Sequence, residues 1–194
     1  MMTINRYLFS YVAILLLSAT TWAQPKLEIT LKHNSAREQQ AQATLEQLLK
    51  EYDLSKWLFT RKVIIEDYAI PRSNPVLTLN TRGDKYALLS RLVHEEIHWY
   101  LDQHLKRTEK AQQELRSMYP KVPVGYPEGA ENEESSYLHL IVNYLEYRAM
   151  KELLGEAKAK EVFAAKDYYK WIYQTVLADE ERVGRVVKKN NLHI

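Results

Sequence analysis

Residues 85–106 carry apolar side chains at helical spacing on more than one side, and this pattern constrains the fold more than any other stretch. Leu88, Leu92 and Trp99 mark one side of the expected helix, whereas Leu89, Val93 and Tyr100 mark another. A helix that is apolar on most of its surface is normally buried in the protein core. The sequence therefore predicts a central buried helix, yet its middle, RLVHEEIHWY, contains two histidines and two glutamates.

The chain on either side of this helix predicts an α+β fold. Three segments have the composition and length of strands, namely KLEITLKH (26–33), RKVIIED (61–67) and VLTLN (76–80). Helices are expected over 36–52 and 133–154, and over the tail 156–190 in two pieces that meet near Lys166–Asp167. The longest irregular loop is expected at 119–129. We therefore expect a small sheet in the N-terminal half, packed on a mainly helical C-terminal half in one domain, residues 24–194.

The first residues have the layout of a secretory signal peptide. Arg6 precedes an apolar run over residues 7–17, and Thr21 and Ala23 stand at the −3 and −1 positions of a cut after residue 23. The apolar run is too short to span a bilayer comfortably, because a spanning helix takes about 20 residues. Residues 1–23 are expected to be removed, leaving a periplasmic or secreted protein without a stable membrane anchor.

Composition narrows the chemistry that an exported chain of this kind can perform. There is no cysteine, so disulfides, thiolate ligands and a thiolate nucleophile are all excluded. Any metal site must therefore be built from histidines and carboxylates. The formal net charge is only +2, and no cluster of five or more lysines and arginines occurs, which argues against nucleic acid as a partner.

His94 and His98 are four residues apart, so on an α-helix they lie on one face about one turn from each other. Two imidazoles in this arrangement can bind one Zn²⁺ ion, which lowers the pKa of a bound water towards about 7. Glu95 is expected to take a proton from that water as the general base. Glu96 falls on a different side and is expected to face solvent or form a salt bridge. The alternative is a pair of hydrogen-bonded core histidines, but burying two imidazoles and a carboxylate without a joint purpose would be costly.

His94-Glu95-Glu96-Ile97-His98 resembles the active-site helix of the zincin metallopeptidases, which share His-Glu-x-x-His and a zinc ion. VLTLN, ahead of the motif helix, resembles the zincin edge strand that pairs with an extended peptide substrate. PVLTLNTR, HEEIHW and YLHLIVNYLEY also resemble a group of uncharacterised bacterial proteins of this layout. The resemblance covers roughly residues 61–155. It implies a zinc-dependent hydrolase, specifically a peptidase, that acts on a peptide or protein substrate.

A third protein ligand is required, and the sequence leaves several candidates. Glu146 is favoured, because Glu146-Tyr147-Arg148-Ala149 resembles the Glu-x-x-Ala piece of a zincin pattern. His139 lies two turns before Glu146 on the same side, about 10 Å away, so at most one of the two can join the zinc. Glu133 is nominated by the resemblance of GAENEESSY to the thermolysin-like pattern. His104 matches a spacing used by other zincins, but it points away from His98 if the helix is continuous.

The sequence does not assign a group that stabilises the oxyanion. Zincins commonly use a Tyr, His or Arg, and the C-terminal half contains Tyr126, Tyr137, Tyr144 and Tyr147. Core-edge packing is the simpler interpretation for most of these, and for YYKWIYQTVL (168–177) as well. A non-catalytic exported binding or structural protein that retains a zincin-like fold remains the alternative function, because a degraded third ligand is the defect that such a protein would show.

Overall fold

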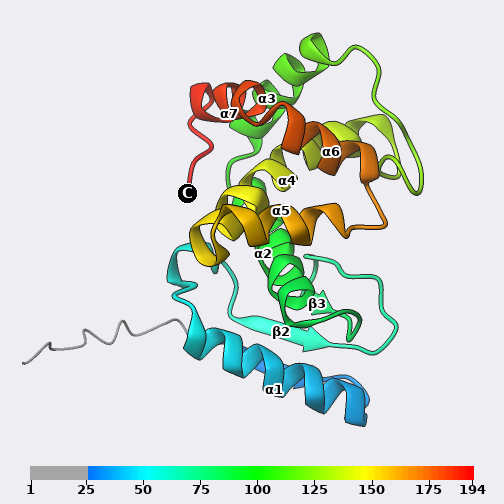
Figure 1. Ribbon diagram of the computed structural model, residues 1–194, viewed down its shortest axis with the longest axis vertical. Coiled ribbons are helices and arrows are strands. Elements are labelled where there is room, and N and C mark those ends of the chain that lie inside the picture. Colours follow the sequence, from blue (N-terminus) through cyan, green and yellow to red (C-terminus); the bar gives the residue numbers. More distant parts are fainter. Residues whose placement is uncertain (1–25) are drawn as a thin grey trace, which may run out of the picture.

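The first half of the chain forms a small parallel sheet, described here from a computed structural model that covers residues 26–194. The predicted signal peptide, residues 1–23, lies outside the described residues. Strands β1 (Glu28–Leu31), β2 (Lys62–Ile65) and β3 (Leu77–Leu79) pair in the order β1-β2-β3, all parallel. All three lie within the segments predicted as strands. Helix α1 (Ala36–Glu51) packs against β1 and β2 (Figure 1).

Strand β3 forms one edge of this sheet, but its outer side is already paired. Val63 of β2 is in register with Leu77, and Ile65 with Leu79. Thr78 points its backbone groups the other way, where its N–H donates to the Arg72 carbonyl at 2.8 Å and its carbonyl accepts from the Arg72 N–H at 3.1 Å. Thr78 is the only residue of this short strand that faces outward, so the chain itself occupies the hydrogen-bonding position expected for a substrate.

Helix α2 (Lys85–Asp102) is the predicted central helix. Asp84 caps it by accepting a hydrogen bond from the Ala87 N–H at 2.8 Å. The helix ends earlier than the pattern predicts, and α3 (Leu105–Met118) starts a new direction. At the break, the His104 N–H bonds the Leu101 carbonyl at 2.9 Å, an i−3 bond that tightens the last turn. The residues at this break, DQHL (102–105), include no Gly or Pro, so the sequence gives no sign that the helix ends here.

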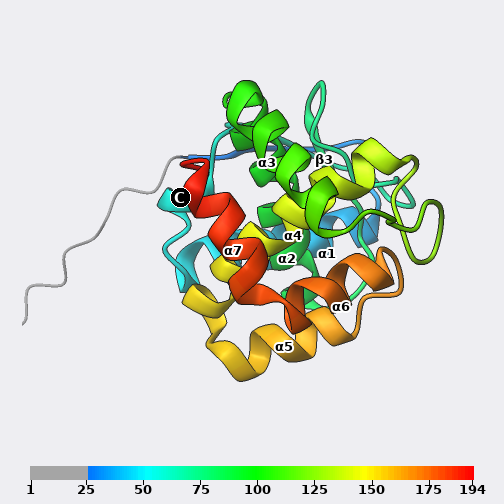
Figure 2. The ribbon, with the colours of Figure 1, turned by 90° about the horizontal axis from the view of Figure 1, so that it is seen from above.

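The second half of the chain is helical and gathers around α4 (Glu133–Leu154). This helix packs against α2 and α3, and against α5 (Glu156–Ala164), α6 (Lys170–Ala178) and α7 (Glu180–Lys189). Figure 2 shows α4 in the middle of these helices. The tail has three helices instead of the expected two, because a second break falls at Asp179. The first break contains Lys166 and Asp167, as predicted, and residues 119–132 form the long connection before α4.

The small sheet with a mainly helical second half confirms the predicted α+β class. Buried apolar side chains from the sheet, from α1 and from every later helix form one core cluster. This shared core fixes α2 relative to α4, and these two helices carry the candidate site. Within residues 26–194 we find no helix with the length and apolar character needed to cross a bilayer.

Candidate metal centre

Three histidines meet where α2 packs against α4. His94 and His98 come from successive turns of α2, and His139 comes from the first half of α4. Their ring centroids are 5.1–5.4 Å apart in every pairing, and one donor nitrogen from each lies within 4.8 Å of the other two. This separation is small enough for the three nitrogens to share one metal ion. Three imidazole donors are a ligand set that catalytic zinc sites use.

The structure brings His139, and not the favoured Glu146, into this donor group. The carboxylate of Glu146 lies behind His94, where Oε2 is 2.9 Å from His94 Nδ1 and 3.1 Å from the Tyr173 hydroxyl. The Ser90 hydroxyl donates to Glu146 Oε1, and Lys166 Nζ is 3.6 Å from the same oxygen. Glu146 therefore orients His94 and leaves its Nε2 available for a metal, as carboxylates commonly do around ligating histidines.

The other two candidates for a third ligand lie outside the donor group. Glu133 begins α4, and its exposed carboxylate forms an ion pair with Arg116 at 3.1 Å. His104 lies in the connection between α2 and α3, where its Nδ1 is 2.8 Å from the Tyr100 carbonyl. Glu133 is therefore held by Arg116 and His104 by the Tyr100 carbonyl, and neither contributes to the group of donor nitrogens.

Burial keeps the imidazoles of His98 and His139 in the form that binds metals. Loss of solvent lowers the pKa of His98 well below its usual value, and it lowers the pKa of His139 to about 3; the nearby His94 contributes to both shifts. The two rings are therefore neutral at neutral pH. His139 Nδ1 donates to the Ser135 carbonyl at 2.7 Å, because a carbonyl can only accept, and its Nε2 is left without a proton.

Glu95 is a buried carboxylate next to His94 in the candidate site. It is 6% exposed, and no residue among 26–194 donates a hydrogen bond to its side chain. Burial raises the pKa of Glu95 to about 7, and the charge of Glu146 adds to the rise, whereas His94, Arg91 and Lys166 oppose it. A carboxylate whose pKa lies near neutrality, and which has no structural partner, is suited to accepting and releasing a proton.

Glu96 does not face solvent, which corrects the sequence-based expectation. Its side chain is fully buried, and Oε2 accepts hydrogen bonds from the backbone N–H groups of Phe59 (2.6 Å) and Thr60 (2.9 Å). Burial raises its pKa to about 7. The helix is covered on this side by the connection that follows the short 3₁₀ turn η1 (Ser55–Trp57), so Glu96 supports the fold on the side away from the histidines.

Tyr169 belongs to the stretch that the sequence analysis assigned to core packing; it does pack against the core, but its ring also contacts His139, which the sequence analysis did not predict. It stands at the start of α6 with φ 51° and ψ 34°, a left-handed conformation that is uncommon for a tyrosine. Its ring centroid is 4.4 Å from that of His139 and 6.5 Å from that of His94. Burial, together with the nearby Glu95, raises the pKa of the phenol to about 12, so the hydroxyl keeps its proton. The helix break predicted at Lys166–Asp167 could have indicated this position. A residue just after a break does not have to follow the helical spacing that suggested core packing.

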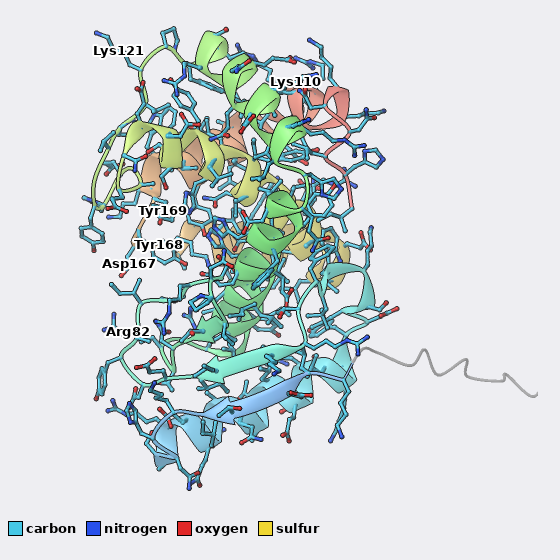
Figure 3. All side chains as sticks on the ribbon, turned by 180° about the vertical axis from the view of Figure 1, so that it is seen from behind. Arg82, Lys110, Lys121, Asp167, Tyr168 and Tyr169 are labelled. Carbon is cyan, nitrogen blue, oxygen red and sulfur yellow. The ribbon has the colours of Figure 1, made fainter. Side chains whose placement is uncertain are left out.

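The side chains near this centre come from both halves of the fold. Figure 3 shows Asp167, Tyr168 and Tyr169 on the helical side and Arg82 on the sheet side of the same face of the molecule. Comparisons with protein-family profiles, with characterised proteins and with solved structures gave no match to this chain. The assignment of a function therefore depends on the geometry of the site and on the sequence patterns described above.

Proposed function

We propose that this protein is a zinc-dependent hydrolase of the zincin-like His-Glu-x-x-His type, and that it cleaves peptide bonds outside the cytoplasm. One observation carries the proposal: three histidines with converging donor nitrogens, two of them buried and His98 partly buried, lie next to a buried carboxylate that accepts no hydrogen bond from the described residues. A zinc ion requires the converging histidine nitrogens, and a general base requires a carboxylate that is free to take a proton.

The residues of the site fit a zinc ion held by His94, His98 and His139. Zinc bound there would polarise a substrate carbonyl and lower the pKa of a water molecule towards about 7. Glu146 holds the His94 ring in place through its 2.9 Å contact, and the Ser135 carbonyl does the same for His139 at 2.7 Å. Such supporting contacts fix the tautomer and the direction of each ligand.

Glu95 and Tyr169 supply the proton chemistry in this proposal. The Glu95 carboxylate takes the proton from the attacking water and then delivers it to the leaving amine nitrogen. The Tyr169 hydroxyl stays protonated and can donate a hydrogen bond to the oxygen of the attacked carbonyl as negative charge develops on it. Glu95 is buried next to His94, and Tyr169 is partly buried against His139; reduced contact with bulk water strengthens electrostatic interactions with the transition state.

The choice of a peptide substrate rests on the resemblance of HEEIHW to the zincin helix, and the location outside the cytoplasm rests on the N-terminal signal pattern. The substrate is not expected to pair with β3 through Thr78, since Arg72 already bonds both backbone groups of that residue. A peptide would instead cross the face on which Arg82 and Tyr169 lie (Figure 3).

Metal content tests the first half of the proposal. Protein purified without chelators should contain close to one zinc per chain by mass spectrometry, and His94→Ala or His98→Ala should lose most of it. Full zinc occupancy in both variants, or no metal in the wild-type protein, would refute the metal assignment.

Glu95→Gln tests the second half, because glutamine keeps the size of the side chain but cannot take a proton. We expect unchanged zinc content and a rate of peptide cleavage lower by about 10²–10⁴-fold. Glu181→Gln, at an exposed position on α7, controls for the change in charge. Chelator-sensitive cleavage that persists in Glu95→Gln would contradict the mechanism. Bound zinc without hydrolysis of any peptide would favour the non-catalytic binding protein.

A further inference from the structure

Two arginines on the sheet side of the site have no carboxylate partner. Arg91 lies one turn before Glu95 on α2, so the two side chains share a face of the helix. Arg82 lies just ahead of α2, and the two guanidinium groups interact electrostatically with each other. Among residues 26–194, neither arginine has a carboxylate oxygen within ion-pair distance, although Lys and Arg residues elsewhere form many such pairs.

Arg91 is held in place by backbone carbonyls. Its Nη1 donates to the Asn80 carbonyl at 3.3 Å and its Nη2 donates to the Arg82 carbonyl at 3.0 Å. The connection crosses close to α2 here, since Gly83 adopts φ 79° and a Cβ at that position would lie 2.8 Å from the Cβ of Ala87. A guanidinium has five N–H donors, so Arg91 is fixed by two contacts and retains others.

Arg91 also lies close enough to groups of the candidate site to interact with them electrostatically. Arg91 interacts electrostatically with Tyr168 and Tyr173 on one side and with Glu95 along the helix. The half-buried Arg91 guanidinium has no carboxylate oxygen within ion-pair distance, so two backbone carbonyls and the more distant Glu95 compensate its lost hydration only in part, and a ligand can repay the rest. Arginine is also the residue best suited to planar, two-point binding of a carboxylate.

We infer that Arg82 and Arg91 form a subsite for a carboxylate of the substrate, next to the catalytic centre. The inference rests on the proposed hydrolase function, because it names the substrate class of that same site: peptides with a carboxylate near the bond to be cleaved. Asp167 lies on the opposite, helical side of this face and is exposed (Figure 3). Its negative charge disfavours a substrate carboxylate at that exposed position.

The carboxylate can come from the C-terminus of the peptide or from an Asp or Glu side chain. Matched peptide pairs distinguish these sources. One pair differs only in a C-terminal carboxylate or carboxamide, and the other differs only in an internal Glu or Gln. For the zinc-loaded wild-type protein we expect one pair to show kcat/KM about 10–100-fold higher for the acidic member, as befits a charge-assisted hydrogen-bonded contact. Equal values within both pairs would overturn the inference.

Substitutions assign the preference to the two arginines. Arg82→Gln should reduce the ratio of kcat/KM values towards one. The fold should not change, because the hydrogen bonds of Arg82 are made by its backbone: its N–H donates to Asn80 Oδ1 at 3.2 Å and its carbonyl accepts from Arg91 at 3.0 Å. Arg91→Lys keeps the charge but loses the planar fork, so it should reduce the preference partly. Arg148→Gln, an exposed arginine on α4, is the matched control and should retain it. Full retention of the preference in Arg82→Gln and Arg91→Lys would also overturn the inference.

A binding measurement separates this inference from the proposed hydrolase activity. In the zinc-loaded Glu95→Gln background, fluorescence anisotropy of the same labelled peptides gives the ratio of Kd values without turnover. A preference for the carboxylate that depends on Arg82 supports the subsite, even if no peptide is hydrolysed by the wild-type protein. Hydrolysis without any such preference, in binding or in kcat/KM, supports the enzyme and refutes the subsite.

Discussion

Lys166→Met should destabilise the protein strongly, although the lysine lies in a connection between two helices. Lys166 Nζ is 3.6 Å from Glu146 Oε1, 2.7 Å from the Ser90 hydroxyl oxygen and 3.3 Å from that of Tyr168. The side chains of Lys166 and Glu146 are 8% and 0% exposed. Burial alone would raise the pKa of Glu146, but Lys166, followed by His94, outweighs it and lowers that pKa. Methionine keeps the length of the side chain but leaves this carboxylate without its cation.

The expected magnitude follows from the burial of the pair. Removing one partner of a buried ion pair costs about 3–5 kcal/mol, because the remaining charge is left uncompensated. Glu146 keeps its hydrogen bonds from Ser90, His94 and Tyr173, so we expect a value near the lower end, about 3 kcal/mol. For a chain of this size, each kcal/mol lowers Tm by about 2–4 °C, which gives a fall of roughly 6–12 °C.

Thermal and urea unfolding, followed by circular dichroism with a chelator present, measure this effect without a contribution from bound metal. Lys56→Met is the matched control. Lys56 Nζ lies only 2.7 Å from Glu152, but the two side chains are 42% and 47% exposed, so its loss should cost less than about 1 kcal/mol. The double variant Lys166→Met/Glu146→Gln should recover part of the lost stability, since it removes the buried charge. A loss for Lys166→Met no larger than that for Lys56→Met would refute this reasoning.

His139→Ala should remove most bound zinc, whereas Glu133→Gln should retain it, and the reverse result in metal analysis would restore the ligand set suggested by the thermolysin-like pattern. Tyr169→Phe should keep the zinc and lower kcat by about 10²-fold or more, as loss of an oxyanion donor does, and an unchanged kcat would remove Tyr169 from the mechanism. Glu96→Leu should lower the free energy of unfolding by about 1–3 kcal/mol, because leucine removes the acceptor of two part-buried backbone hydrogen bonds, and a neutral effect in urea unfolding would show that these bonds contribute little.

Local patterns were sufficient to predict the elements that carry the site. The strand segments, the buried character of α2 and the length of α4 all follow from residue spacing and were confirmed by the structure. The same spacing placed His94 and His98 on one face of a helix. These features are set by the spacing of nearby residues, so contacts with distant parts of the chain did not change them.

Glu96 shows where such reasoning fails. Its position on the helix, on a different side from the histidines, led us to expect a residue that faces solvent or forms a salt bridge. The partners turned out to be backbone N–H groups of Phe59 and Thr60, more than 30 residues earlier in the chain. Backbone donors have no sequence signature, so a helix pattern cannot reveal that a distant connection will cover this side. The contact of Tyr169 with His139 was missed for a related reason, since it depends on the left-handed conformation of Tyr169 in a connection.

The third ligand depends on how far α4 is shifted along α2, and no local pattern encodes that shift. His139 and Glu146 share the face of α4 that meets α2, and both contact the motif: His139 reaches the donor group, and Glu146 reaches the back of His94. A shift of two turns, about 10 Å, would exchange their roles. The shift is set by the core around both helices and by the buried Lys166, which pairs with Glu146 and so holds this carboxylate behind His94. The sequence thus specifies two residues that can support a metal, and the packing of the second half of the chain decides which of them lies among the donors.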